Sequence, residues 1–137
     1  MSIPVSLLEL PEVSASFGPT PYILTVGPDH APRATSVAVE WAGDVLVAGA
    51  GRRVAANVEQ NDQVTLLWPA PAPGGHALIV DGWADLRRPP AGGLELVIRP
   101  ASAILHVTRR VSAEPGPDAD QAPPAGEPER GAEVAGP

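Results

Sequence analysis

Two adjacent arginines at the start of a predicted helix are the residues of this chain best suited to bind a ligand. Arg52 and Arg53 follow Gly51 and precede Val and Ala residues at helical spacing. A helix N-terminus offers free backbone N–H groups and a partial positive charge, and Arg forks match phosphate oxygens. Basic side chains are slightly unfavourable at such an end, so the arrangement predicts a bound phosphate. The alternative is that both arginines are simply solvated.

The chain offers few other groups for catalysis. It has no Cys, which excludes disulfides, thiolate nucleophiles and Cys-based metal sites. Its three histidines lack the spacing of metal ligands, so no metal site is expected and no catalytic residue is identified. Trp41, Trp68 and Trp83 are more typical of a core or a dimer interface than of a stacking platform, although one of them could stack on a ring.

The elements that must position these residues are mostly strands, in which apolar and polar residues alternate with a period of two. Short connections rich in Gly, Pro, Asn and Asp separate them. Gly82 predicts a bulge or a close backbone approach, and Pro100 predicts a break between the last two strands. Helices are expected near the start, over 2–10 and ended by Pro11, and over 52–60. The expected strands are 22–26, 34–41, 45–48, 64–68, 77–86, 94–98 and 103–108.

Seven short strands with hairpin-like connections predict a mainly β fold. An antiparallel sheet closed into a small barrel is favoured over a sandwich, because several strands are apolar on both faces and closure removes exposed edges. One or two short helices complete this domain, which is expected to span residues 1–112. Residues 113–137 contain no Ile, Leu, Phe, Trp or Tyr, so they are expected to form a disordered tail.

Charge and hydropathy limit the partners. The formal net charge is −7, and the tail contributes −5 of it through six acids and one arginine. Acidic chains repel phosphate backbones, so no nucleic-acid role is expected. No apolar run approaches the roughly 20 residues that span a bilayer, and no secretory signal is visible, so we expect no membrane association and a cytoplasmic location.

The order of these elements, from residue 22 to residue 107, resembles the FMN-binding split-barrel family related to pyridoxamine 5'-phosphate oxidase. The resemblance covers about two thirds of the chain and rests on the order of several short motifs. These motifs are Asp29-His30-Ala31-Pro32-Arg33, Thr35-Ser36-Val37, Gly51-Arg52-Arg53-Val54-Ala55-Ala56-Asn57-Val58, Asn61-Asp62, Asp81-Gly82-Trp83-Ala84 and Ile98-Arg99-Pro100.

The resemblance implies a small antiparallel split β-barrel that binds FMN at the interface of a homodimer. The flavin would carry the redox chemistry on a small-molecule substrate, while the protein orients and shields it. A barrel this small would also expose apolar strand faces if left alone. The cofactor-binding residues that the resemblance indicates are Arg33, Thr35, Ser36, Gly51, Arg52, Arg53 and Asn57.

Two other functions remain open. Val54 stands where the family commonly has a phosphate-binding Lys, which favours a non-catalytic barrel that binds a small ligand or a protein. The third reading is a reductase that uses the deazaflavin F420 on the same fold. The acidic tail of that cofactor needs a basic groove, and the net negative charge of the domain counts modestly against it.

Overall fold

The computed structural model describes residues 2–108 of the chain, and the predicted tail over 113–137 lies outside the described residues. This part of the chain forms eight strands and two helices. They are β1 (Ser2–Val5), α1 (Leu10–Ala15), β2 (Tyr22–Val26), β3 (Pro32–Ser36), β4 (Val39–Ala42), β5 (Val45–Gly49), α2 (Arg52–Gln60), β6 (Gln63–Trp68), β7 (His76–Arg87) and β8 (Glu95–Val107).

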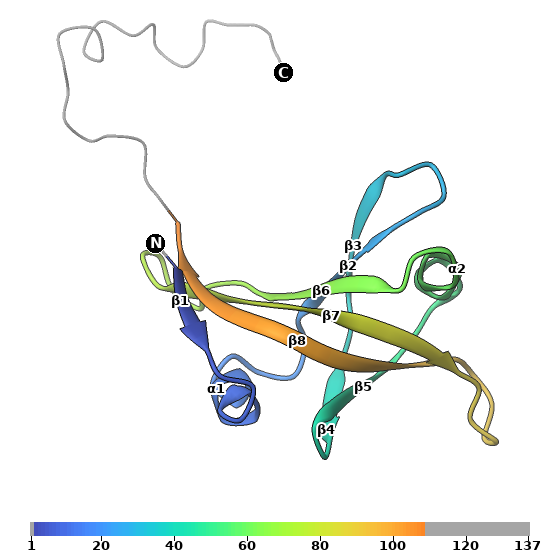
Figure 1. The fold of residues 1–137 in the computed structure, drawn as a ribbon, viewed down its shortest axis with the longest axis horizontal. Helices are drawn as coiled ribbons and strands as arrows, with labels where there is room; N and C mark the ends of the chain where they lie inside the picture. Colours follow the sequence, from blue (N-terminus) through green and yellow to red (C-terminus); the bar gives the residue numbers. More distant parts are fainter. Residues whose placement is uncertain (1, 109–137) are drawn as a thin grey trace, which may run out of the picture.

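The strands form one antiparallel sheet in the order β3-β2-β6-β7-β8-β5-β4, with β1 paired to β8 (Figure 1). Its two edge strands, β3 and β4, are consecutive in the chain. Between them, the N–H of Val37 donates to the Pro21 carbonyl at 3.0 Å, and the N–H of Val39 donates to the Pro19 carbonyl at 2.8 Å. These two bonds hold the segment between β3 and β4 against the segment that precedes β2. The chain thereby passes from one edge of the sheet to the other, and the sheet closes into a split barrel. The expected fold class is confirmed.

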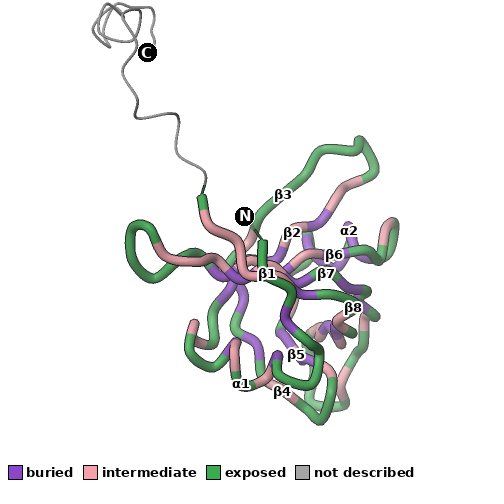
Figure 2. The backbone as a smooth tube through the Cα atoms, turned by 60° about the vertical axis from the view of Figure 1, so that its left-hand side comes forward, coloured by how far each residue is buried: buried purple, intermediate pink, exposed green. Residues whose placement is uncertain are grey.

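The core lies inside the barrel and consists of the side chains on one face of each long strand. Buried and exposed residues alternate along the backbone, as Figure 2 shows in purple and green. Helix α2 packs against β2 and β7 and adds Val54 and Val58 to this core. The side chains that are essentially inaccessible include Leu10, Ile23, Leu46, Leu66, Trp68, Leu78, Val80, Leu96 and Ile98.

The expected helix over 2–10 is wrong. Residues Ser2–Val5 form an edge strand, because Ile3 and Val5 are β-branched and Pro4 is tolerated where no ladder donor is needed. The first helix begins only at Leu10, and Pro11 lies in its first turn rather than at its end. Proline suits that position because its missing N–H would have no partner there.

The expected strand over 34–41 is two strands. The chain leaves β2 after Ser36 and joins β5 from Val39, so one run of alternating residues serves two ladders. Conversely, the expected break at Pro100 is wrong, because β8 continues through it. Pro100 and Ser102 pair with Gly82 and Asp81, which leaves one extra residue on β8 and forms a bulge. A proline that cannot donate is tolerated at such a bulge.

The predicted bulge or close approach at Gly82 is confirmed. A Cβ atom at this position would collide with the carbonyl oxygen of Arg99 on the neighbouring strand. The absence of a side chain therefore lets β7 and β8 stay paired through the bulge. Within residues 2–108, neither helix has the length and apolar character needed to cross a membrane.

Candidate functional site

A hollow of about 420 Å³ lies between the β2–β3 turn and helix α2. The turn forms one side of it, and the first two turns of the helix form the other. Both walls contribute cationic and polar side chains from residues far apart in the sequence. The lining residues are Gly27, Pro28, Asp29, Ala31, Arg33, Arg53, Ala56 and Asn57.

Asn57, which lines the hollow, belongs to a buried polar pair. The Nδ2 group of Asn57 donates a hydrogen bond to Thr25 Oγ1 at 3.0 Å, and the side chains are 3% and 1% exposed. Asn57 Oδ1 accepts no hydrogen bond from the residues described, and it lies close to Gly27, where an added Cβ would come within 3.1 Å of it. Gly27 therefore allows the turn to approach the helix over this amide.

The wall formed by the turn is held by its own hydrogen bonds. The N–H of Gly27 donates to the Ala31 carbonyl at 3.2 Å, and the N–H of His30 donates to the Gly27 carbonyl at 2.9 Å. Asp29 Oδ1 accepts the N–H of Ala31 at 3.2 Å. His30 has a φ of 64°, in the left-handed region that glycine adopts most readily. These hydrogen bonds hold the turn in one conformation and so set the position of Arg33, which follows it in β3.

The wall formed by helix α2 carries its N-terminus. Gly51 is the N-cap residue and no side chain caps the helix, so the first N–H groups lack an intrahelical acceptor. The first turn contains no acidic residue, and it contains both Arg52 and Arg53. Val54, at the position where the resemblance implies a Lys, is buried in the core. Any cation for a ligand here must therefore come from the arginines.

The structure brings together three of the seven predicted residues. Arg33, Arg53 and Asn57 line the hollow, and Arg33 pairs across the ladder with Thr25, the acceptor of the Asn57 hydrogen bond. Gly51 and Arg52 lie at the adjacent N-terminus of the helix but do not line the hollow.

The two predicted hydroxyl residues lie further along β3 and do not line the hollow. Thr35 pairs with the buried Ile23, so it shares the face of the strand that carries Arg33. Ser36 pairs with Tyr22 on the opposite face of the sheet. Their assignment as cofactor contacts stays a prediction.

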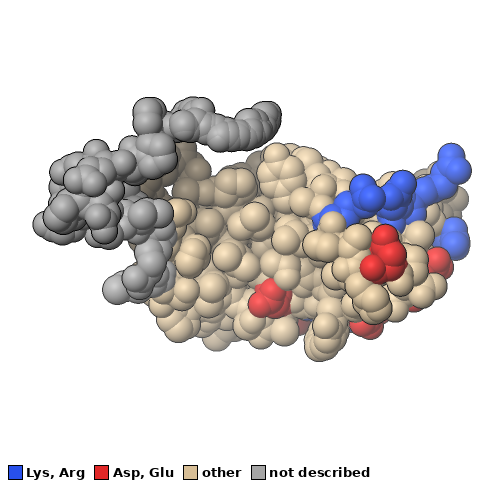
Figure 3. All heavy atoms as spheres, turned by 90° about the horizontal axis from the view of Figure 1, so that it is seen from above, with Lys and Arg blue, Asp and Glu red and all other residues tan. Residues whose placement is uncertain are grey.

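Sequence reasoning missed Thr25, Gly27 and Asp29. Gly27 belongs to a connection between two expected strands, Asp29 was used only as the first residue of a motif, and Thr25 only as part of the expected strand 22–26. The signal that could have found Thr25 is a hairpin between the strands on either side of this turn, because that pairing places Thr25 opposite Arg33. Figure 3 shows that basic side chains on the face in view gather at the end of the molecule that carries α2 and this turn. Among residues 2–108, no three His, Asp or Glu side chains group as metal ligands do.

No protein-family model matches the sequence, and no curated protein matches it significantly. Solved structures do match. A Clostridium acetobutylicum protein related to general stress protein 26, of the pyridoxinephosphate oxidase family, is 12% identical with a TM-score of 0.60, covering 76% of this chain and 89% of that one. The FAD-binding protein of Mycobacterium smegmatis is 17% identical with a TM-score of 0.59, covering 80% of this chain and 100% of that one.

An F420 reductase is 22% identical with a TM-score of 0.52, covering 62% of this chain and 88% of that one. Identities of this size establish a shared fold and leave the ligand open. The chain therefore has the split-barrel fold of the pyridoxamine 5'-phosphate oxidase-like proteins.

Proposed function

We propose that this protein is a homodimeric, cytoplasmic flavoprotein oxidoreductase that binds FMN and acts on a small molecule. The observation that carries the proposal is the convergence of Arg33 and Arg53 on one hollow beside the free N–H groups of α2. Two Arg side chains and a helix N-terminus suit a terminal phosphate group. Similar structures that include an FAD-binding protein support a flavin as the ligand.

In this proposal the chain binds and orients the cofactor, and the flavin supplies the hydride transfer. Arg33 and Arg53 hold the phosphate, with Arg52 and the N–H groups after Gly51 adding positive potential. Asn57 Oδ1, which accepts no hydrogen bond from residues 2–108, is proposed to accept one from a hydroxyl beside the phosphate. Thr35, on the same face of β3 as Arg33, is proposed to contact the ring system. Ser36 lies on the opposite face and has no part in this arrangement.

The homodimer is supported by an apolar row across the outer face of the sheet. Cross-strand pairing places Tyr22, Leu67, Ile79 and Ile104 side by side on β2, β6, β7 and β8. Tyr22 is 43% exposed, and the other three are half-buried. A contiguous apolar row on a sheet face is typical of an interaction surface, and a second copy would cover it.

The first test is the visible absorption spectrum of the purified protein before and after FMN is added, followed by gel filtration. A flavin band that co-elutes with wild type, and is lost in an Arg33→Ala/Arg53→Ala variant, supports the proposal. Arg88→Ala is the matched control, because Arg88 is exposed and lies outside the hollow. A protein that leaves FMN in the free fraction contradicts it.

The same experiment separates the alternatives. Binding of F420 without FMN favours the reductase, which a similar structure supports. Hemin belongs in the comparison because a heme storage protein of Vibrio cholerae shares the fold. Binding of none of the three leaves the non-catalytic barrel, for which the buried Val54 is the supporting observation.

A further inference from the structure

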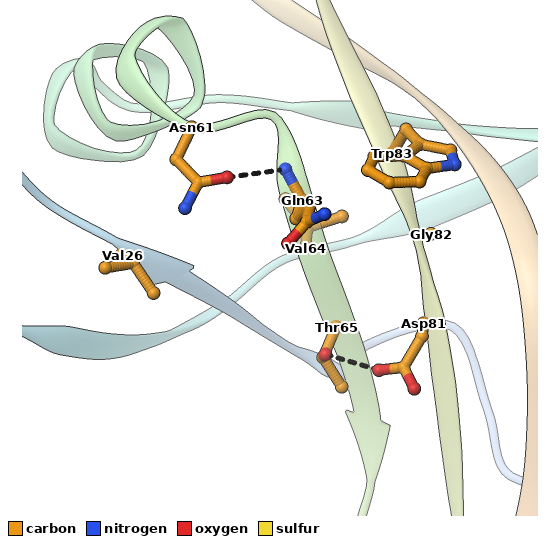
Figure 4. A pocket seen from close by; sticks show the side chains of 8 residues that line it. All are labelled: Val26, Asn61, Gln63, Val64, Thr65, Asp81, Gly82 and Trp83. Carbon is orange, nitrogen blue, oxygen red and sulfur yellow. Dashed lines mark hydrogen bonds between the residues drawn. The ribbon is translucent and has the colours of Figure 1, made fainter. Parts of the chain in front are cut away.

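A second hollow, of about 390 Å³, lies on the outer face of β6 and β7 (Figure 4). It shares no lining residue with the hollow that contains Arg33 and Arg53. One wall is an aromatic ring, and the others are polar. The lining residues are Val26, Asn61, Gln63, Val64, Thr65, Asp81, Gly82 and Trp83.

Trp83 forms the aromatic wall. Its side chain is 45% exposed, whereas Trp68 is buried and donates its indole N–H to the Gly18 carbonyl at 2.7 Å. Trp41 donates its indole N–H to Ser14 Oγ at 2.9 Å. The indole N–H of Trp83 has no such acceptor among residues 2–108. Trp83 is thus the most exposed of the three tryptophans, and its ring and N–H are both open to a ligand.

Asp81 provides a fixed negative charge beside this ring. It lies two residues before Trp83 on the same face of β7, and its Oδ1 accepts a hydrogen bond from Thr65 Oγ1 at 2.6 Å. The lining contains no Arg or His, and no salt bridge to Asp81 forms within the described residues. Arg99, which pairs with Trp83 across the ladder, is bound to Asp85 at 3.3 Å. The hollow therefore favours a cation.

Two amides complete the opposite wall. Asn61 Oδ1 accepts the backbone N–H of Gln63 at 3.1 Å, which orders the end of the helix and the start of β6. Gln63 pairs directly with Trp83, so its side chain lies on the same face as the ring. These side chains add hydrogen-bonding groups to the hollow without adding positive charge.

We propose that this hollow binds a small organic cation. The ammonium group lies against the Asp81 carboxylate, and the carbon skeleton or N-methyl groups of the ligand lie against the indole of Trp83. An aromatic ring and a carboxylate both attract a positive charge, the first through its quadrupole and the second through Coulomb attraction. An anion is repelled by Asp81, and a neutral ring gains only the stacking contact.

The test is a titration of the full chain with benzyltrimethylammonium, followed by two-dimensional NMR of the backbone amides and indole N–H groups. We expect saturable shifts of the indole N–H of Trp83 and of the amides of residues 81–83. Neutral benzyl alcohol should shift the same signals weakly and without saturation over the same concentrations. Shifts of equal size with benzyl alcohol would show that no cation is selected and would overturn the proposal.

Two variants and one control locate the contacts. Asp81→Asn should weaken binding by about fivefold or more, because the ligand loses its counter-charge. Trp83→Leu should weaken it by about threefold, the size of an exposed cation–π contact. Asp85→Asn is the matched control, on the same strand and face but on the other side of Trp83 and already paired with Arg99. It should change the affinity by less than about twofold at physiological salt.

Equal losses in Asp81→Asn and Asp85→Asn would show that only the diffuse negative potential attracts the ligand, and would overturn the site. An absence of shifts in the wild-type protein would do the same. Both aspartates are exposed, so the variants are expected to fold, and gel filtration checks that all of them have the oligomeric state of the wild type.

Discussion

Asn57 donates its amide N–H to Thr25 Oγ1 at 3.0 Å and so ties helix α2 to strand β2 across 32 positions of sequence. Both side chains are buried, and the ladder places Arg33 directly opposite Thr25. One hydrogen bond therefore sets the helix that carries Arg53 against the strand pair that carries Arg33. Because both cations line one hollow, this bond, together with the packing of α2 in the core, sets their separation.

Removing either partner of this bond should destabilise the protein. Thr25→Val keeps the volume but removes the acceptor, and we expect a loss of about 1–3 kcal/mol because a buried amide loses its partner. Asn57→Ala should cost a similar amount. In urea denaturation, the double variant should lose less than the sum of the two single losses, as expected for groups in contact. Strictly additive losses would show that the bond does not contribute to stability.

Arg53 should contribute more to anion binding than Arg52. Arg53 lines the hollow and Arg52 does not, although both lie in the first turn of α2. We expect Arg53→Ala to weaken FMN binding by about tenfold or more, the size of a charge-assisted hydrogen bond, and Arg52→Ala to weaken it less. Fluorescence titration with FMN measures both. The reverse order would mean that the phosphate lies outside the hollow.

Gly82→Ala should destabilise the barrel by about 2 kcal/mol, because the new methyl group would collide with the Arg99 carbonyl and force β7 and β8 apart. Gly49→Ala is the control, since an added Cβ there meets nothing within 4 Å. It should change the stability by less than about 0.5 kcal/mol. Thermal and urea unfolding compare the two variants, and equal effects would contradict the close approach.

Tyr22→Glu should shift the protein from dimer to monomer. Tyr22 lies in the apolar row on the outer face, and a carboxylate there would be buried without a partner in the proposed interface. Ile3→Glu is the control, because Ile3 is 44% exposed against 43% for Tyr22 but pairs with Leu105, on the other face of the sheet. Light scattering over a range of concentrations measures the mass. Dimers that persist in Tyr22→Glu would exclude the row as the interface.

Truncation after Ser112 should leave the melting temperature within about 2 °C of the full chain, which corresponds to a stability change under about 0.5 kcal/mol. The buried core of the described fold ends at Ala103, well before this point. Differential scanning calorimetry of both chains checks the proposal that residues 1–112 form the folding unit. A drop of several degrees would show that later residues stabilise it.

Local patterns in the sequence predicted the elements whose ends are set by neighbouring residues. Helix α2 was expected over 52–60 and spans Arg52–Gln60, because valines at helical spacing follow Gly51 and Asn61 ends the run. Strand β2 and the long strand through Gly82 were likewise predicted from period-two alternation and a single glycine. The mainly β, barrel-like fold class follows from these patterns alone.

The tertiary structure decided everything that depends on which strands pair. The apolar and polar residues of 34–41 alternate as they would in a single strand. Closure of the barrel nevertheless divides this segment between two ladders. Pro100 reads as a break, but the bulge opposite Gly82 accommodates it. Ile3 and Val5 became a strand because β8 offered a free edge. Propensity is a weak local preference, and long-range pairing and burial override it.

The candidate sites show the same division. The resemblance indicated Arg33, Arg53 and Asn57 as separate cofactor-binding residues, but only the register of β2 with β3 and the Thr25 bond bring them to one hollow. It gave no sign that Trp83 would be the exposed tryptophan. The reason is physical: the sequence fixes which side chains exist and their local spacing, whereas the distance between residues far apart in the chain is set by packing of the whole barrel.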